Sequence, residues 1–563
     1  MSRKKDLRGT RAPAAPANWR SAAAWVFLLI TYLLLRGNQV AVPIDRDEGA
    51  FGYIAQRLLH GELPYRDWSD LKPPGVFYIY TLAVAVFPPT SKGVHLFLLL
   101  WNFAVLLLVV SLGRALGGRR AGWWCGFFYA LVSAAPSAQS FKAGVEMLAI
   151  LPLAASVRLA LAAPHAAGWR RVLCLAASGV LGALTCWTKQ PMALSLLIIP
   201  PWYLARARPG PTQDGAAAGA GAASLGSLCR RLTRDALWWL AGGLLASVLI
   251  CLPFILAGAL EEMIYWSFTH PWLYARLASP NLLQVMGERL APLAPELGAP
   301  LALAVAGAIW AAVRRRPKWW VGLLFLGLSF AGACHTAFLY PYYFAQVFPA
   351  LALAAGAAVA AALEECARIW RGVAAAGIGL LAALAPLGLL LGLRHAYLFP
   401  RHPEQMSWAV IGAQDFEAAP ELAGYLRQRT RPEDWIFIYG SEAQIAFMAR
   451  RRLANPYVMI YPLTFPLPRH REFQERTWAF LQQTKPRYVL VPWNPISRAE
   501  QPATDPYFKQ RFEPYVQEHY QIEAALFRTG MAQYQWVMQP TTALLKEKDA
   551  GLSYTVWRRK ADH

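Results

Sequence analysis

Residues 44–75, IDRDEGAFGYIAQRLLHGELPYRDWSDLKPPG, directly follow the first apolar run of the chain. Asp45, Asp47 and Glu48 place three carboxylates within four residues at the end of that run. Carboxylates beside hydrocarbon cost free energy, so they are usually kept for a function. Two interpretations fit this spacing. The acids either cap the start of a helix or belong to a chemical site, and the rest of the sequence bears on that choice.

The composition excludes a soluble globule. Of 563 residues, 56% are hydrophobic and only 16% are charged, and the apolar residues form a long series of runs. This pattern predicts a polytopic α-helical membrane protein. The net charge of +22 does not indicate nucleic-acid binding, because the basic residues fall in short clusters between apolar runs, as in cytoplasmic loops. The partner that this pattern predicts is a lipid bilayer.

The apolar runs and basic clusters together predict eleven spans with a cytoplasmic N-terminal tail over 1–20. That tail and the first run resemble a signal peptide, but no small-residue cleavage site follows, so we expect a retained span. The run 76–87 is too short to cross a bilayer and predicts an interfacial helix. The expected spans are 21–35, 95–112, 121–138, 146–163, 172–188, 191–205, 236–257, 298–313, 319–337, 343–362 and 373–393.

With this orientation every strong basic cluster lies inside, and the first outer loop, 36–92, carries the acids outside. The Gly/Ala/Ser-rich piece 209–227 is expected to be a cytoplasmic linker. Seven cysteines lie in or beside apolar segments without C-x-x-C pairing, which supports neither a disulfide framework nor a zinc site.

We expect two parts, a membrane domain over 21–393 and an extracytoplasmic accessory domain over 394–563. The second part has a soluble composition in which strand and helix patterns alternate, so it predicts a small α/β domain. Expected strands are 435–439 and 487–491, and expected helices are 421–429, 442–450 and 471–483. No glycine-rich nucleotide fingerprint follows either strand.

Unusual polar residues gather at the outer ends of the predicted spans. Each has an ordinary explanation alone: Lys189 could snorkel, Glu146 could cap a helix, and His335 could be a hydrogen-bonded interfacial residue. Together they predict an outward-facing cleft with acids, fixed cations and aromatics. Its members are Asp45, Asp47, Glu48, Asp70, Lys72, Lys142, Glu146, Lys189, Gln190, His270, Arg276, His335, Tyr340, Tyr342 and Tyr343.

Such a cleft suits the transfer of a sugar from a lipid phosphate. That reaction needs a carboxylate to deprotonate the acceptor hydroxyl and cations to stabilise the departing phosphate. Aromatic rings offer surfaces on which a sugar can stack. An outer-surface site also suits a donor whose polyprenyl tail stays in the bilayer.

Several motifs resemble the GT-C membrane glycosyltransferases that use polyprenyl-phosphate sugars, the superfamily of protein O-mannosyltransferases and the lipid A aminoarabinose transferase, glycosyltransferase family 39-like. The spacing from Asp47-Glu48 to Lys72-Pro73-Pro74-Gly75 is the most specific element. The resemblance extends through Ala50 to Ala55, Gly61 to Asp67, Thr188-Lys189-Gln190, Tyr340 to Phe344 with Gln346 and Pro349, and the tail segments Arg431 to Ile436 and Ala449-Arg450-Arg451.

The resemblance implies a hexosyl- or pentosyltransferase of the bacterial cytoplasmic membrane that inverts the anomeric centre by direct displacement. It makes Asp47 the general base and Glu48 its neighbour, which holds the acceptor or orients the base. Lys72 and Lys189 would meet the donor phosphate. We place Arg276 with these cations, and we expect substrate contacts from Asp45, Tyr65, Glu146, Gln190, His270, His335, Tyr342 and Tyr343.

Two departures from the family pattern leave questions open. Some relatives carry a histidine where Tyr342 stands, so the role of that position is undecided. The triplet Asp45-Arg46-Asp47 resembles the metal-binding Asp-x-Asp of other GT-C enzymes. Arg46 would partly satisfy the two acids without metal, so we expect no metal ligands and no required cofactor, with a divalent cation as the alternative.

The partners expected are a polyprenyl-phosphate sugar donor and a cell-envelope acceptor, which could be a lipid, a polysaccharide or a protein hydroxyl. Two other classes of function compete with this prediction. A flippase for lipid-linked glycans should carry ionisable groups deep within its spans, whereas here most lie at outer ends. A non-catalytic scaffold for envelope assembly should be indifferent to the loss of Asp47.

Overall fold

The computed structural model describes residues 19–207, 225–277, 281–314, 320–369, 373–412, 414–547 and 551–560. The basic tail up to residue 18 and the predicted linker from 209 to 224 lie outside these ranges. The last three residues assigned to that linker, 225–227, already belong to helix α9 (Leu225–Leu256).

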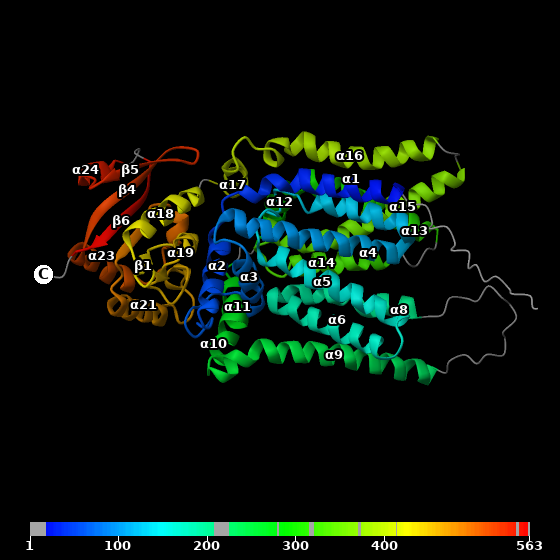
Figure 1. The fold of residues 1–563 in the computed structure, drawn as a ribbon, viewed down its shortest axis with the longest axis horizontal. Helices are drawn as coiled ribbons and strands as arrows, with labels where there is room; N and C mark the ends of the chain where they lie inside the picture. The colour runs from blue at the N-terminus through cyan, green and yellow to red at the C-terminus, as the bar shows by residue number, and fades with distance from the viewer. Residues whose placement is uncertain are drawn as a thin grey trace, which may run out of the picture.

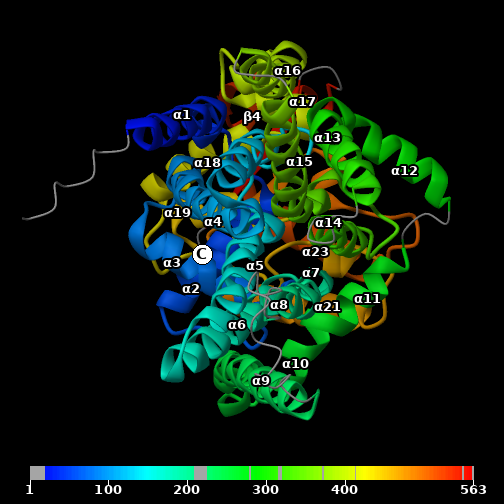
Figure 2. The ribbon, with the colours of Figure 1, turned by 90° about the vertical axis from the view of Figure 1, so that its right-hand side faces the viewer.

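A long helical bundle forms one part of the molecule and a sheet-containing C-terminal domain forms the other (Figure 1). Among the described residues, eight helical stretches are long and apolar enough to cross a membrane. Viewed along the bundle, α4, α5 and α15 lie near the centre, with α1, α9 and α16 at its edge (Figure 2). The helices of these stretches are α1 (Trp19–Arg36), α4 (Ser91–Val132), α5 (Val145–Ala162), α6 (Gly168–Thr188), α9, α13 (Ala294–Val313), α15 (Phe348–Ile369) and α16 (Val373–Leu398).

The 42-residue α4 is two antiparallel helices rather than one. Gly117 and Gly118 leave helical geometry between them, and Gly118 has φ +79°, which glycine adopts readily. Beyond this turn the chain folds back, so that Tyr129 Oη donates a 2.9 Å hydrogen bond to Asn102 Oδ1. Two predicted spans, 95–112 and 121–138, are therefore this hairpin.

The other predicted spans also fall on helices. α14 (Trp320–Ala333) is short, and the predicted span 191–205 is broken into η3 (Gln190–Met192), α7 (Ala193–Leu196) and α8 (Ile199–Ala207). The run 76–87 forms α3 (Pro74–Val86), whose 13 residues are too few to span a bilayer. The predicted class, a polytopic helical membrane protein with a C-terminal α/β domain, is confirmed.

The C-terminal domain holds a six-stranded mixed sheet in the order β2-β1-β3-β6-β4-β5. Its parallel half joins β1 (Trp435–Ile438) to β2 (Arg452–Leu453) and to β3 (Tyr488–Pro492), with Val489 opposite Phe437. The antiparallel half, β4 (Tyr520–Gly530), β5 (Gln533–Met538) and β6 (Leu552–Arg559), was not predicted. The helices of the domain include α18 (Ala419–Arg429), α19 (Ala443–Ala449), α21 (His470–Thr484) and α23 (Tyr507–His519).

Helix α2 (Arg46–Leu59) lies where the bundle meets the C-terminal domain (Figure 1). Asp45 caps its start, and Glu48 completes a reciprocal capping box. One face of α2 packs tightly on α19: a Cβ at Gly49 would lie 2.3 Å from the backbone nitrogen of Gln444. The acids of the opening stretch therefore lie between the two parts.

Candidate active site

A cavity of about 1210 Å³ lies between the bundle and the C-terminal domain. The bundle side of its wall includes the start of α2, the loops around Lys72 and Lys142, η3 and the segment 335–343. Further bundle residues come from α11 (His270–Ala275), α12 (Leu282–Leu290) and α16. The C-terminal side contributes Ser441, Met459, Tyr461, Phe465, Pro495, Ile496, Ala499, Glu500 and Gln501.

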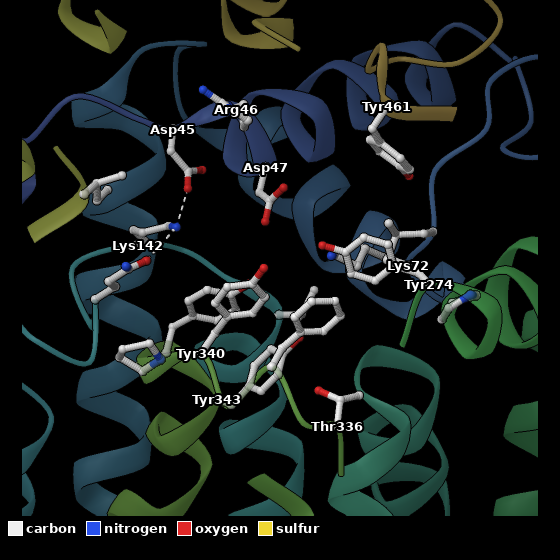
Figure 3. A pocket seen from close by; sticks show the side chains of 18 of the residues that line it. Asp45, Arg46, Asp47, Lys72, Lys142, Tyr274, Thr336, Tyr340, Tyr343 and Tyr461 are labelled. Atoms are coloured by element: carbon white, nitrogen blue, oxygen red, sulfur yellow. Dashed lines mark hydrogen bonds and ion pairs between the residues drawn. The ribbon is translucent and has the colours of Figure 1, made fainter. Parts of the chain in front are cut away.

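Asp47 points from the first turn of α2 into this cavity (Figure 3). The nearby Asp45 already has partners within the protein: its carboxylate accepts the Glu48 amide at 2.9 Å and forms an ion pair with Lys142. Within the described part of the chain, the Asp47 carboxylate has neither a hydrogen bond nor an ion pair. It is therefore available to accept a proton from a bound molecule.

Lys72 reaches the same cavity from the loop before α3. The Asp70 carboxylate accepts the Lys72 amide at 3.0 Å and fixes this loop. Burial lowers the pKa of Lys72, but nearby carboxylates, chiefly Asp47 and Asp70, raise it above its usual value, so the amine is charged. Its Nζ has no hydrogen-bond or ion-pair partner among the residues described, which leaves this cation free for an anionic ligand.

Tyr65 holds this loop from behind rather than facing the cavity. It is 1% exposed, its ring contacts Phe77 and Phe254, and its hydroxyl donates a 2.6 Å hydrogen bond to the Lys72 carbonyl. The structure therefore gives Tyr65 a positioning role where the sequence indicated a substrate contact.

Two further lysines lie beside adjacent tyrosines. Lys142 Nζ lies 5.2 Å from the centre of the Tyr342 ring, and Lys189 Nζ lies 4.3 Å from that of Tyr343. Lys189 also forms a 2.8 Å ion pair with Glu146. Rings near ammonium groups stabilise the cations through their quadrupoles, so these tyrosines help to keep the two lysines charged at the cavity.

The aromatic residues of this wall stack on one another. Tyr340 lies between Phe338 and Tyr342, with ring centres 5.3 and 5.4 Å away and planes tilted by 8° in both pairs. Phe338 in turn stacks on Tyr274 at 4.9 Å. The Arg289 guanidinium also lies over the Tyr340 ring, 5.5 Å from its centre, so this tyrosine belongs to an aromatic cluster at the cavity wall.

Glu48 does not reach the cavity. It is 0% exposed and accepts the amides of Asp45 at 3.1 Å and Ala143 at 2.7 Å. It also forms a 2.8 Å hydrogen bond with Nε2 of the buried His95 of α4. Instead of touching a substrate, Glu48 joins α2 to the bundle.

Four other residues named from the sequence divide into two pairs. Gln190 and His335 line the cavity, and burial lowers the pKa of His335 to about 4, so this imidazole is neutral at pH 7. His270 is fully buried on the Trp266 ring at 4.6 Å, outside the cavity lining. Arg276 is exposed and also lies outside that lining, so the structure does not bring it to Lys72.

The expectation that Arg46 would partly neutralise the acids beside it is wrong. Its guanidinium instead donates to Gln414 Oε1 at 2.7 Å and to the Ile496 carbonyl at 3.3 Å, both in the C-terminal part of the chain. Asp45, the other acid beside it, forms an ion pair with Lys142. No group of three or more potential metal ligands is found within the described ranges.

Several wall residues were missed by sequence reasoning. Tyr461, Ser441 and Glu500 come from the C-terminal domain, where no motif marked them. Lys142 belongs to the predicted polar cleft without a specific role there, and its position before an apolar span is the signal in the sequence that points to it.

Comparison with solved structures identifies the fold. ArnT from Cupriavidus metallidurans in the apo state aligns over 96% of this chain and 98% of its own, with a TM-score of 0.55 and 14% identity. The same protein bound to undecaprenyl phosphate aligns over 94% and 99%, with a TM-score of 0.53 and 14% identity. The apo oligosaccharyltransferase of Archaeoglobus fulgidus aligns over 93% and 75%, with a TM-score of 0.49 and 13% identity.

The likeness to ArnT, the lipid A aminoarabinose transferase, shows that this chain has the GT-C fold. Scanning the sequence against family models gives no match. A search of curated proteins also gives no match.

Proposed function

We propose that this protein is an inverting glycosyltransferase that moves a sugar from a polyprenyl-phosphate donor to a hydroxyl of a cell-envelope acceptor. The observation that carries the proposal is the Asp47 carboxylate, which is unpaired among the described residues and faces a large cavity that also holds the free cation of Lys72. A base beside a cation is the minimum that this displacement requires.

In the proposed step, the acceptor hydroxyl oxygen attacks the anomeric carbon of the sugar while Asp47 takes the hydroxyl proton. The new glycosidic C–O bond forms as the bond from the anomeric carbon to the phosphate oxygen breaks. The electron pair of that bond leaves with polyprenyl phosphate, whose charge Lys72 stabilises together with Lys189. A single displacement inverts the anomeric centre and needs no covalent enzyme intermediate.

The GT-C fold supports a lipid-linked donor, because the ArnT structure that shares this fold is bound to undecaprenyl phosphate. We place the site at the outer face of a bacterial cytoplasmic membrane, with the N-terminus inside and the C-terminal domain outside. The basic clusters between apolar runs support this orientation. The polyprenyl tail would then remain in the bilayer while its phosphate enters the cavity.

The test is label transfer from a panel of synthetic polyprenyl-phosphate sugars to membrane extracts, with purified wild type and Asp47→Asn compared with and without chelator. Transfer by the wild type that the variant loses supports the enzyme and identifies the sugar, and the chelator arms report on a divalent cation. Absence of transfer from every donor would contradict the proposal. Movement of the labelled donor across proteoliposome membranes without transfer would indicate a flippase.

A further inference from the structure

Three consecutive residues at the start of α2 point toward three different parts of the molecule. Asp45 is paired with Lys142 of the bundle, and Asp47 enters the cavity. Arg46, between them, extends toward the C-terminal domain (Figure 3). Because successive helical residues are rotated by a fixed angle, the contact that holds Arg46 also helps to set the direction of Asp47.

The surroundings of Arg46 come from C-terminal segments far away in sequence. Besides its hydrogen bonds to Gln414 and Ile496, its guanidinium lies 5.3 Å from the centre of the Phe416 ring. Its nearest carboxylate partner is Glu442, with Nη2 and Oε1 3.6 Å apart. Glu442 directly precedes α19, the helix on which α2 packs.

Glu442 is an unusual residue for this interface. Its side chain is 1% exposed and lies outside the cavity lining, so a substrate cannot reach it. One carboxylate oxygen accepts the Ser497 hydroxyl, whereas the other, Oε1, has no hydrogen-bond partner among the described residues and forms its ion pair with Arg46. A buried carboxylate without a full set of partners is costly, and the cation paired with it in the described part of the chain is Arg46, the residue beside Asp47.

We propose that Glu442 is a positioning residue: through Arg46 it lets the C-terminal domain hold the start of α2, and therefore the Asp47 carboxylate, in the orientation needed for proton transfer. This inference rests on the proposed function. It gives the C-terminal domain a part in the chemistry beyond covering the cavity.

The chain offers a matched control at the other end of the same interface. Arg452 of β2 forms a 3.0 Å ion pair with Glu62, which follows the end of α2. This pair also joins α2 to the C-terminal domain, but it lies outside the cavity lining and makes no contact with Arg46. Arg452→Gln therefore weakens docking of the domain without changing the support of Asp47.

The first measurement is kcat and donor KM for Glu442→Gln and Arg452→Gln in the full-length protein. We expect Glu442→Gln to lower kcat tenfold or more with donor KM within twofold, and Arg452→Gln to keep kcat within twofold. The double variant Arg46→Gln/Glu442→Gln should be no slower than Arg46→Gln alone. Equal losses of kcat in Glu442→Gln and Arg452→Gln, or a wild-type kcat in Glu442→Gln, would overturn the proposal.

Hydrogen exchange supplies a readout that does not depend on activity. The Glu48 and Gly49 amides bond to Asp45 in the first turn of α2, so a loosened helix start should exchange faster. We expect faster deuterium uptake over 45–52 in Glu442→Gln but not in Arg452→Gln. Unchanged uptake in Glu442→Gln would refute the positioning role even in an active enzyme. A wild type that transfers no sugar would refute the proposed function instead, while the exchange result still decides whether the contact exists.

Discussion

Lys189 Nζ lies 2.8 Å from the Oε1 atom of Glu146. Burial lowers the pKa of Lys189, and the Glu146 carboxylate is the main group that raises it again. Glu146 is itself 2% exposed and so is poorly placed to contact a substrate. The pair is therefore best understood as a means of keeping a buried amine charged beside the cavity.

A change of pH dependence should follow from Glu146→Gln. A charged Lys189 is present below its pKa and is lost as the pH rises through it. Without the Glu146 carboxylate that pKa falls further, so the alkaline decline of donor kcat/KM should move down by about one pH unit or more. The measurement is the pH–rate profile of the variant beside wild type.

The control for that profile is Asp235→Asn. Asp235 is ion-paired with Arg171 and lies outside the cavity lining, so Asp235→Asn removes a buried acid without affecting Lys189. An alkaline limb that stays in place in Glu146→Gln would show that Lys189 is not the group titrating there.

Replacing Asp47 by Asn should remove the base and keep the shape of the cavity. General-base catalysis contributes a factor of about 10² to 10⁴, so the variant should lose about 3 to 5 kcal/mol of transition-state stabilisation. The measurement is kcat with saturating donor. Asp67→Asn is the control, since Asp67 belongs to the same stretch between α1 and α4, pairs with Arg66 and lies outside the cavity lining. A loss below about threefold in kcat would exclude Asp47 as the base.

Lys72→Ala should weaken use of the donor with the fold preserved. A hydrogen bond to a charged group contributes about 1.5 to 3 kcal/mol, which corresponds to an increase in donor KM of about 10- to 150-fold. Inhibition by free polyprenyl phosphate should weaken in parallel, because the same cation meets the product. Lys92, exposed at the start of α4, provides the matched Lys→Ala control. An unchanged response to donor concentration would remove Lys72 from the phosphate site.

Hydrophobic run length predicted most of the fold, because a helix that crosses lipid must be long and apolar. Even the two spans of α4 were separable, since Arg119 and Arg120 interrupt the apolar run next to the glycine turn. The antiparallel strands β4 to β6 were missed. In β4, apolar and polar residues do not alternate, because the apolar run Ala524 to Phe527 lies between polar Glu523 and Arg528. The place of β4 in the sheet therefore depends on its pairing with β6 rather than on a local pattern.

The part of the site nearest in sequence to the acids was also the most predictable. Asp47 and Lys72 face the cavity because a capped helix start and a proline-bounded loop fix their directions locally. His270 was misplaced for a tertiary reason: it packs against Phe473 and Tyr461 of the C-terminal domain, and no sequence pattern links those segments. The partner of Arg46 was unpredictable for the same reason.

Measurements of thermal stability can show whether Glu48 has a structural role or a direct role in catalysis. The structure places its carboxylate in a buried hydrogen bond with His95, and leaving one partner of a buried hydrogen bond unsatisfied costs about 1 to 3 kcal/mol. Glu48→Ala should therefore lower the thermal unfolding midpoint of the detergent-solubilised protein, and Glu48→Gln, which can still accept the Ala143 amide, should lower it less. Activity should fall in step with the folded fraction in both variants. If Glu48→Gln had the thermal unfolding midpoint of the wild type but a kcat reduced as strongly as in Asp47→Asn, Glu48 would take part directly in the reaction.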